Sequence, residues 1–86
     1  MTIIGAPVAV WTAETGRPQR LFWGGRRYRV TDTPTLVDAD FGFITHPPDL
    51  PPVWRFQGTT DDGQSLVFDV RFDHARGEWV LLRTWE

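Results

Sequence analysis

Short stretches in which apolar and polar residues alternate follow one another along the chain, and turn-forming residues separate them. No stretch combines the helical spacing of apolar positions with capping residues, so the pattern predicts strands alone. We expect six strands, at residues 7–12, 19–23, 26–31, 53–58, 64–73 and 78–85. Because sequential antiparallel strands joined by tight turns form a meander, residues 1–86 are expected to be one all-β domain. Its five or six strands should curl, or close into an SH3-like barrel without exposed edges.

The segment 17–30 contains the first well-defined hairpin, since Gly24-Gly25 suits a two-residue turn in which both positions need positive φ. That turn pairs Leu21 with Tyr28 and places Arg20 opposite Arg29. The hairpin then has a mostly apolar face with Gln19, Leu21, Trp23, Arg26, Tyr28 and Val30. Its opposite face holds Arg20, Phe22, Arg27 and Arg29.

The register of the preceding hairpin is left open by the sequence. An even loop places Val8 and Val10 beside the apolar face of the 17–30 hairpin and sends Trp11 to its basic face. An odd loop reverses both assignments, because neighbouring residues of a strand point to opposite sides.

The C-terminal half predicts two further hairpins. A three-residue loop at Asp61-Asp62-Gly63 pairs Phe56 with Phe68, whereas a two-residue loop would match apolar with polar side chains. A four-residue loop at 74–77 pairs Phe72 with Trp79 and, further along, Leu66 with Trp85. Arg83 then falls opposite Phe68 and interrupts the apolar face. The predicted core of this half is Trp54, Phe56, Leu66, Phe68, Val70, Phe72, Trp79, Leu81 and Trp85.

Residues 38–52 form the longest irregular stretch and contain four prolines within six positions. Such a segment favours polyproline II and excludes helix. We interpret it as a loop that folds back over one end of the core, with a binding loop or a proline-rich ligand segment as the alternative.

Composition narrows the function classes. An 86-residue chain is one small domain, and the absence of Cys excludes disulfides and thiolate chemistry. No apolar run approaches the roughly 20 residues of a membrane span, and the N-terminus has no basic region typical of a secretory signal, so we expect a cytoplasmic protein without membrane association. The net charge of −2 provides no overall attraction to nucleic acid, but five of the nine arginines lie within residues 17–29.

Residues suited to catalysis or cofactor binding are sparse. His46 and His74 have no second ligand at metal-binding spacing, and Gly24-Gly25 lacks the context of a phosphate-binding loop. Asp73-His74 falls in a predicted turn, where Asp commonly accepts a backbone hydrogen bond. We therefore predict neither an enzyme nor a bound metal or cofactor, and keep a small hydrolase or lyase using Asp73 and His74 as the least favoured hypothesis.

The basic face of the 17–30 hairpin is the candidate site. Like charges directly opposite each other destabilise a sheet, so Arg20 and Arg29 require a negative neighbour. This neighbour is either internal (Asp69, Asp73 or the acidic stretch 32–49) or supplied by a partner. We predict a non-enzymatic interaction module that binds an acidic protein surface; the alternative is single-stranded nucleic acid, which interleaved aromatic and Arg side chains also suit. The predicted contact residues are Trp11, Arg20, Phe22, Arg27 and Arg29.

Three motifs resemble a family of small bacterial domains of unknown function from high-GC genomes: V-x-V-W-T, R-P-x-R-L-x-W-G-G-R-R-Y-R-V and G-E-W-V-L-L-R-T-W-E. Domains of this family are also appended to proteins similar to Y-family translesion polymerases. The resemblance covers the first thirty residues and the last ten, while the proline-rich middle departs from the family's shorter, Trp- and Arg-rich one. It implies a DNA-repair context and supplies no catalytic residues.

Overall fold

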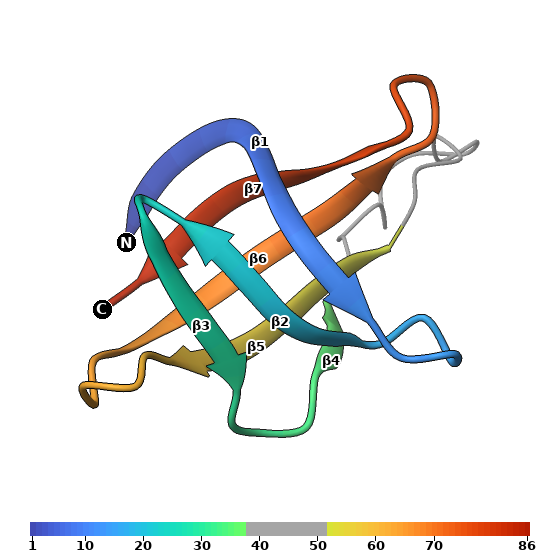
Figure 1. The fold of residues 1–86 in the computed structure, drawn as a ribbon. Coiled ribbons are helices and arrows are strands. Elements are labelled where there is room, and N and C mark those ends of the chain that lie inside the picture. Colours follow the sequence, from blue (N-terminus) through green and yellow to red (C-terminus); the bar gives the residue numbers. More distant parts are fainter. Residues whose placement is uncertain (38–51) are drawn as a thin grey trace.

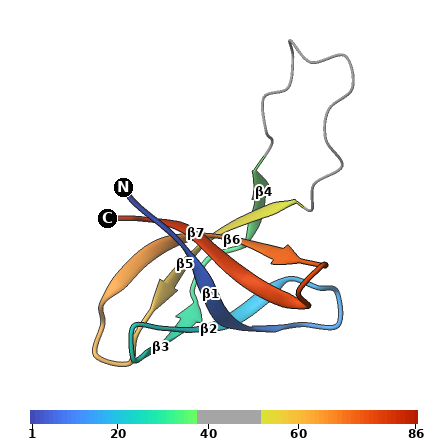
Figure 2. The same cartoon turned by 90° about the horizontal axis from the view of Figure 1, so that it is seen from above.

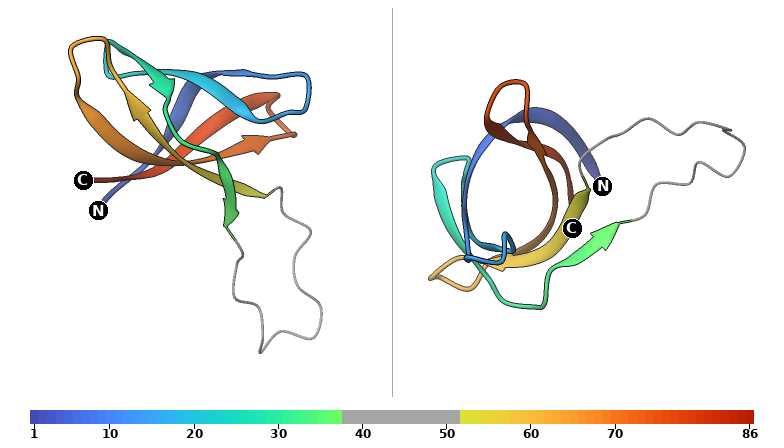
Figure 3. Two further views of the ribbon diagram at one scale, coloured as in Figure 1. Left: turned by 90° about the horizontal axis from the view of Figure 1, so that it is seen from below. Right: turned by 90° about the vertical axis from the view of Figure 1, so that its right-hand side faces the viewer.

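A computed structural model describes residues 1–37 and 52–86 as one antiparallel sheet that closes into a barrel (Figure 1). The sheet order is β3-β2-β1-β7-β6-β5-β4, and an additional β3–β5 pairing closes the six strands other than β4 into a ring, seen end-on in Figure 3. The prediction of an all-β antiparallel meander that closes into a barrel is confirmed. The strands are β1 (Thr2–Thr12), β2 (Pro18–Trp23), β3 (Arg26–Val30), β4 (Thr35–Val37), β5 (Val53–Thr59), β6 (Ser65–Asp73) and β7 (Glu78–Trp85).

Strand β1 begins five residues earlier than predicted, at Thr2. The sequence pattern failed here because Gly5 and Pro7 resemble strand-breaking residues. Gly5 instead adopts a φ of 67° where the β1–β7 register shifts, between Ile3 and Ala6. A bulge of this kind bends the strand and increases its twist, which allows β1 to pair with β7 over its first part and with β2 at its end.

Strand β4 was not predicted. Its three residues follow Pro34 and pair with Val53–Arg55, at the start of β5. In Figure 2, β4 and the start of β5 project away from the barrel as a short ribbon. The predictions for His46 and for the proline-rich loop concern residues 38–51, which lie outside the described ranges.

The β2–β3 hairpin has the predicted register, with Leu21 opposite Tyr28 and Arg20 opposite Arg29. Gly24 and Gly25 adopt φ values of 60° and 77°, as a two-residue turn of this type requires. The register that the sequence left open is the even one, in which Trp11 lies opposite Arg20. Trp11 therefore belongs to the outer, basic side of the hairpin.

The C-terminal hairpins confirm most of the predicted pairs, including Phe56 with Phe68 and Phe72 with Trp79. A register shift in β7 separates Leu81 from Arg83, so the remaining predicted pairs are wrong. Arg83 lies opposite Asp69 rather than Phe68. Trp85 lies opposite Val67 rather than Leu66, on the outer side. The bulge removes the conflict that an inward Arg83 would cause, because it turns Thr84 toward the core instead.

The barrel interior is filled by aromatic and aliphatic side chains from both halves of the chain. The Phe68 ring meets Tyr28 edge-on at a centroid distance of 4.9 Å and lies 5.8 Å from Phe56. Gly58 permits the close approach of β3 and β5, since a Cβ there would lie 3.0 Å from the Cβ atom of Tyr28 on β3 and 2.8 Å from a ring atom of Phe68 on β6. The buried apolar residues are Leu21, Tyr28, Phe56, Phe68, Val70 and Leu81. Partly buried residues packed against them include Val8, Val10, Trp23, Val30, Trp54, Leu66 and Trp79.

Asp69 is fully buried although it points to the outer side of β6. Arg55 donates two hydrogen bonds to its carboxylate, at 2.8 and 2.9 Å, and the indole of Trp85 donates a third at 3.0 Å. The Nε atom of Arg83 lies 3.3 Å from the same carboxylate, and the guanidinium of Arg55 lies 5.0 Å from the centre of the Trp85 ring. Asp69 thus neutralises two arginines and anchors Trp85 on the outer side of β5, β6 and β7.

Burial raises the pKa of Asp69, whereas the hydrogen bonds from Arg55 and Trp85 lower it. The charges of Arg55 and Arg83 lower it further, and the pKa of the carboxyl lies below its ordinary value. A carboxyl with a lowered folded-state pKa contributes stability that is fully present above its unfolded-state pKa of about 3.9. That contribution is lost as the pH falls through the lower folded-state value.

Asp69→Asn is expected to lower the free energy of unfolding by about 2–4 kcal/mol at neutral pH, because it leaves two arginines without their carboxylate. The arginines are partly exposed, which keeps the loss below that of a fully buried pair. Urea denaturation across pH should show the difference from wild type shrinking below about pH 4. The exposed Asp61→Asn variant is the control and should change stability by less than about 1 kcal/mol. An Asp69→Asn variant as stable as this control would contradict the assigned role.

Candidate basic aromatic face

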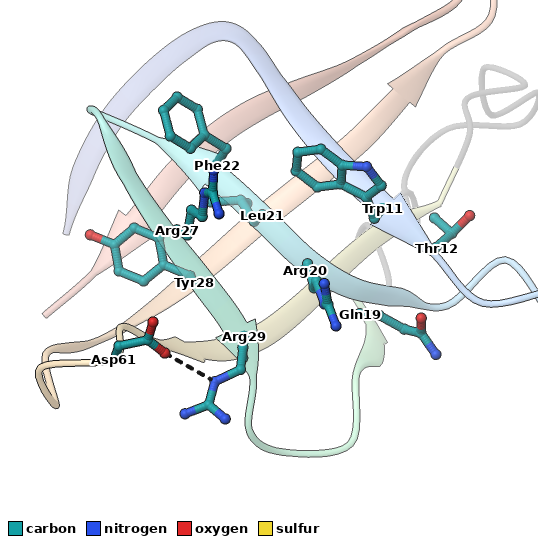
Figure 4. Close-up of a pocket in the computed structure, with 10 residues that line it drawn as sticks. All are labelled: Trp11, Thr12, Gln19, Arg20, Leu21, Phe22, Arg27, Tyr28, Arg29 and Asp61. Carbon is teal, nitrogen blue, oxygen red and sulfur yellow. Dashed lines mark ion pairs between the residues drawn. The ribbon is translucent and has the colours of Figure 1, made fainter.

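All five predicted contact residues lie on the outer side of β1, β2 and β3, around one open groove of about 780 Å³ (Figure 4). We call them the basic aromatic face: Trp11, Arg20, Phe22, Arg27 and Arg29. Strand alternation brings them together, because their neighbours on the other side of the same strands, such as Leu21 and Tyr28, are buried in the core.

The side chains of this face form two rows across the strands. Trp11, Arg20 and Arg29 are consecutive cross-strand partners in one row. In the next row Phe22 lies between Ala9 and Arg27. Each row therefore combines an aromatic ring with at least one guanidinium.

The aromatic residues of the face are unusually exposed for their type. Trp11 has 56% of its surface accessible and Phe22 has 41%. Phe22 also borders a second, shallower groove of about 410 Å³, which reaches Trp23 and Glu78. The two rings thus lie in water beside the arginines of the same groove.

The charges of the face are only partly balanced within the described ranges. Arg29 Nε lies 3.7 Å from the Asp61 carboxylate, in a pair whose side chains are 65% and 96% exposed. Arg26, at the edge of the hairpin, pairs with Asp62 at 3.6 Å. Arg20 and Arg27 form no ion pair with any residue of 1–37 or 52–86. Exposed pairs of this length contribute little, so the face keeps most of its positive charge.

The acidic residues that the sequence offered as internal partners have other roles where the structure describes them. Asp69 binds Arg55 and Arg83. The Asp32 carboxylate accepts the backbone N–H of Gln57 at 2.8 Å, close to the β3–β5 closure. Asp73 accepts two backbone N–H groups of its own turn. The remaining acidic residues of the 32–49 stretch lie outside the described ranges.

Asp61 and Gln19 line the groove although the sequence placed them elsewhere. Gln19 was expected on the apolar face of the hairpin, but the register shift between β1 and β2 at Trp11/Thr12 leaves Gln19 exposed in the groove and buries Pro18 instead.

The sequence places Asp61, with Asp62, in the three-residue loop of a hairpin and indicates no contact with the arginines. The loop between β5 and β6 reaches Arg29 only because β3 pairs with β5, with Arg29 opposite Thr59. The sequence signal for this contact is weak, since residues 31–52 separate β3 from β5 and contain no turn motif that specifies their pairing.

Asp73 ends β6 and His74 begins the turn to β7, and neither residue lines one of the two grooves. The Asp73 carboxylate is engaged by the backbone N–H groups of Ala75 and Arg76, as predicted for a turn-initiating Asp. His74 is exposed, and its ring meets Phe72 edge-on at 5.0 Å. Among the described residues no group of three His, Cys, Asp or Glu side chains is placed to hold a metal ion. The described residues also include no helix with the length and hydrophobicity needed to cross a bilayer.

No protein-family model matches the chain, and neither curated proteins nor solved structures show significant similarity to it.

Arg20→Glu should raise the free energy of unfolding by about 0.2–1 kcal/mol at low ionic strength, because it replaces a pair of like charges opposite each other with an Arg29–Glu pair. Urea denaturation measures this difference, since urea is uncharged and leaves the ionic strength low. In about 1 M NaCl the gain should largely disappear. A loss of stability on this substitution would contradict the description of Arg20 as unbalanced, since it would show that Arg20 already has an internal anionic partner.

Proposed function

We propose that this chain is a non-enzymatic interaction module that binds an acidic surface of another protein through the basic aromatic face. The observation that supports this proposal most is that Arg20 and Arg27 lack an ion-pairing partner among the described residues while Trp11 and Phe22 beside them are exposed. The like charges of Arg20 and Arg29, directly opposite each other, and the apolar rings left in water are both unfavourable in the isolated domain. An acidic partner with an apolar contact relieves both together.

The residue types of the face support a protein partner. Trp, Phe and Arg are enriched at the centres of protein interfaces, where rings bury large areas and guanidinium groups form paired hydrogen bonds. Positive potential confined to one face also accelerates association with a partner of opposite charge. The overall charge of −2 limits this attraction to the side of the barrel that carries the groove.

Single-stranded nucleic acid is the second candidate ligand. The observation that favours it is the alternation of rings and guanidinium groups over adjacent strands of a barrel, an arrangement in which bases stack and phosphates pair. The DNA-repair context implied by the sequence resemblance points the same way. A hydrolase or lyase using Asp73 and His74 gains no support, because the Asp73 carboxylate is used by its own turn.

The double variant Arg20→Gln/Arg27→Gln is expected to weaken binding of fluorescein-labelled polyglutamate by about tenfold or more at low ionic strength, since each charged hydrogen bond contributes roughly 1.5–3 kcal/mol. Fluorescence anisotropy measures the affinity. The matched control is Arg17→Gln/Arg76→Gln, which makes the same change in net charge at exposed arginines outside the groove.

Equal weakening by the two double variants would contradict the proposal, because it would show that only net charge matters. Labelled oligothymidylate provides the comparison with nucleic acid. If it binds more tightly than polyglutamate, with an affinity that falls steeply as salt rises, the second candidate replaces the first.

A further inference from the structure

The spacing of the arginines restricts the kind of acidic partner, if the proposed function holds. The two rows of the basic aromatic face are two residues apart along the strands, which is about 6.6–6.8 Å. Arg20 and Arg29 lie directly opposite each other in one row, and Arg27 lies in the next. The face therefore presents two cationic positions with the period of an extended chain.

A polypeptide that lies extended over β3 has the same period. The side chains that it turns toward the sheet occur at every second residue, again about 6.6–6.8 Å apart. Two carboxylates at such positions reach both rows together, whereas adjacent carboxylates point to opposite sides. Trp11, next to Arg20 in one row, and Phe22, next to Arg27 in the other, remain available to apolar parts of the same chain.

We propose that the basic aromatic face binds an extended acidic peptide whose carboxylates occupy alternate positions. One carboxylate lies between Arg20 and Arg29, and the next contacts Arg27. The inference rests on the proposed function and names the chemistry and spacing of its ligand.

The ion pair of Asp61 with Arg29 supports a carboxylate as the ligand group that this face binds. Asp61 is an anion that the described structure places in the groove, 3.7 Å from Arg29. Its side chain is 96% exposed and its ion pair is long, so a ligand carboxylate displaces it at little cost. The planar guanidinium also matches a carboxylate through two parallel hydrogen bonds.

The charge distribution favours a short peptide over a long polyanion. The chain as a whole carries −2, and Asp61 stands at one end of the groove. A peptide of a few residues is confined to the positive face. A longer polyanion would extend over surface that repels it.

Two capped peptides of identical composition test the spacing: Thr-Glu-Thr-Glu-Thr, with its carboxylates at alternate positions, and Thr-Glu-Glu-Thr-Thr, with its carboxylates at adjacent positions. Titrations followed by ¹⁵N NMR at low ionic strength should show the alternating peptide binding about tenfold more tightly, the effect of one additional charged hydrogen bond. The largest shifts should fall on the amides of β2 and β3 and on the indole of Trp11. Arg27→Gln should remove the preference, whereas Arg76→Gln, a change at an exposed arginine outside the groove, should leave it intact.

The outcomes separate this inference from the proposed function. Equal affinity of both peptides for the face would contradict the proposed alternate spacing of the carboxylates. It would leave the proposal of an acidic partner standing. No binding of either peptide or of polyglutamate would overturn both. Asp61→Asn should strengthen binding of the alternating peptide about twofold to threefold by removing a competing carboxylate of modest strength. Tighter binding of oligothymidylate than of the alternating peptide would overturn the inference in favour of nucleic acid.

Discussion

The register of the β2–β3 hairpin determines which side chains of this barrel are available to a ligand. Two glycines with positive φ fix the turn, and the two-residue period of the strands then places Leu21 and Tyr28 inside and Arg20, Phe22, Arg27 and Arg29 outside. A slip of one residue would bury guanidinium groups and expose the core. The same pairing therefore stabilises the fold and creates the basic aromatic face.

The arginines of the barrel divide into balanced and unbalanced groups. On β5, β6 and β7 a buried carboxylate, Asp69, pairs with Arg55 and Arg83 and accepts a hydrogen bond from Trp85. On β1, β2 and β3 the described acidic residue that forms an ion pair with an arginine of the basic aromatic face is the exposed Asp61. Both groups of arginines belong to one closed sheet. The sheet does contain a buried carboxylate, so the difference between the two groups depends on where that carboxylate lies. The buried carboxylate of Asp69 lies beside Arg55 and Arg83 and not beside the arginines of the basic aromatic face.

Much of this fold follows from the sequence, and the deviations have identifiable causes. Turn residues and apolar alternation predict the β2–β3 and β5–β6 registers, since each turn offers few ways to match apolar with apolar positions. The bulge at Gly5 was missed because Gly5 and Pro7 resemble strand-breaking residues, and the bulge in β7 was missed although Arg83 interrupts the apolar alternation there. Strand β4 was missed because three residues after a proline are too few to show alternation. The face itself was predicted residue by residue, but Asp61 was not, because its position depends on the β3–β5 closure.

Among residues 1–37 and 52–86, Arg20 and Arg27 form no ion pair on the outer side of the barrel, whereas Arg55 is held by Asp69. Modification with phenylglyoxal, mapped by mass spectrometry, reports the accessibility of each arginine in the folded protein. Arg20 and Arg27 should react as fast as the exposed Arg76, and Arg55 should react several-fold more slowly, since roughly 1 kcal/mol of hydrogen bonding corresponds to a factor of about five. Protection of Arg20 and Arg27 equal to that of Arg55 would contradict the account, because it would show that the fold already neutralises them.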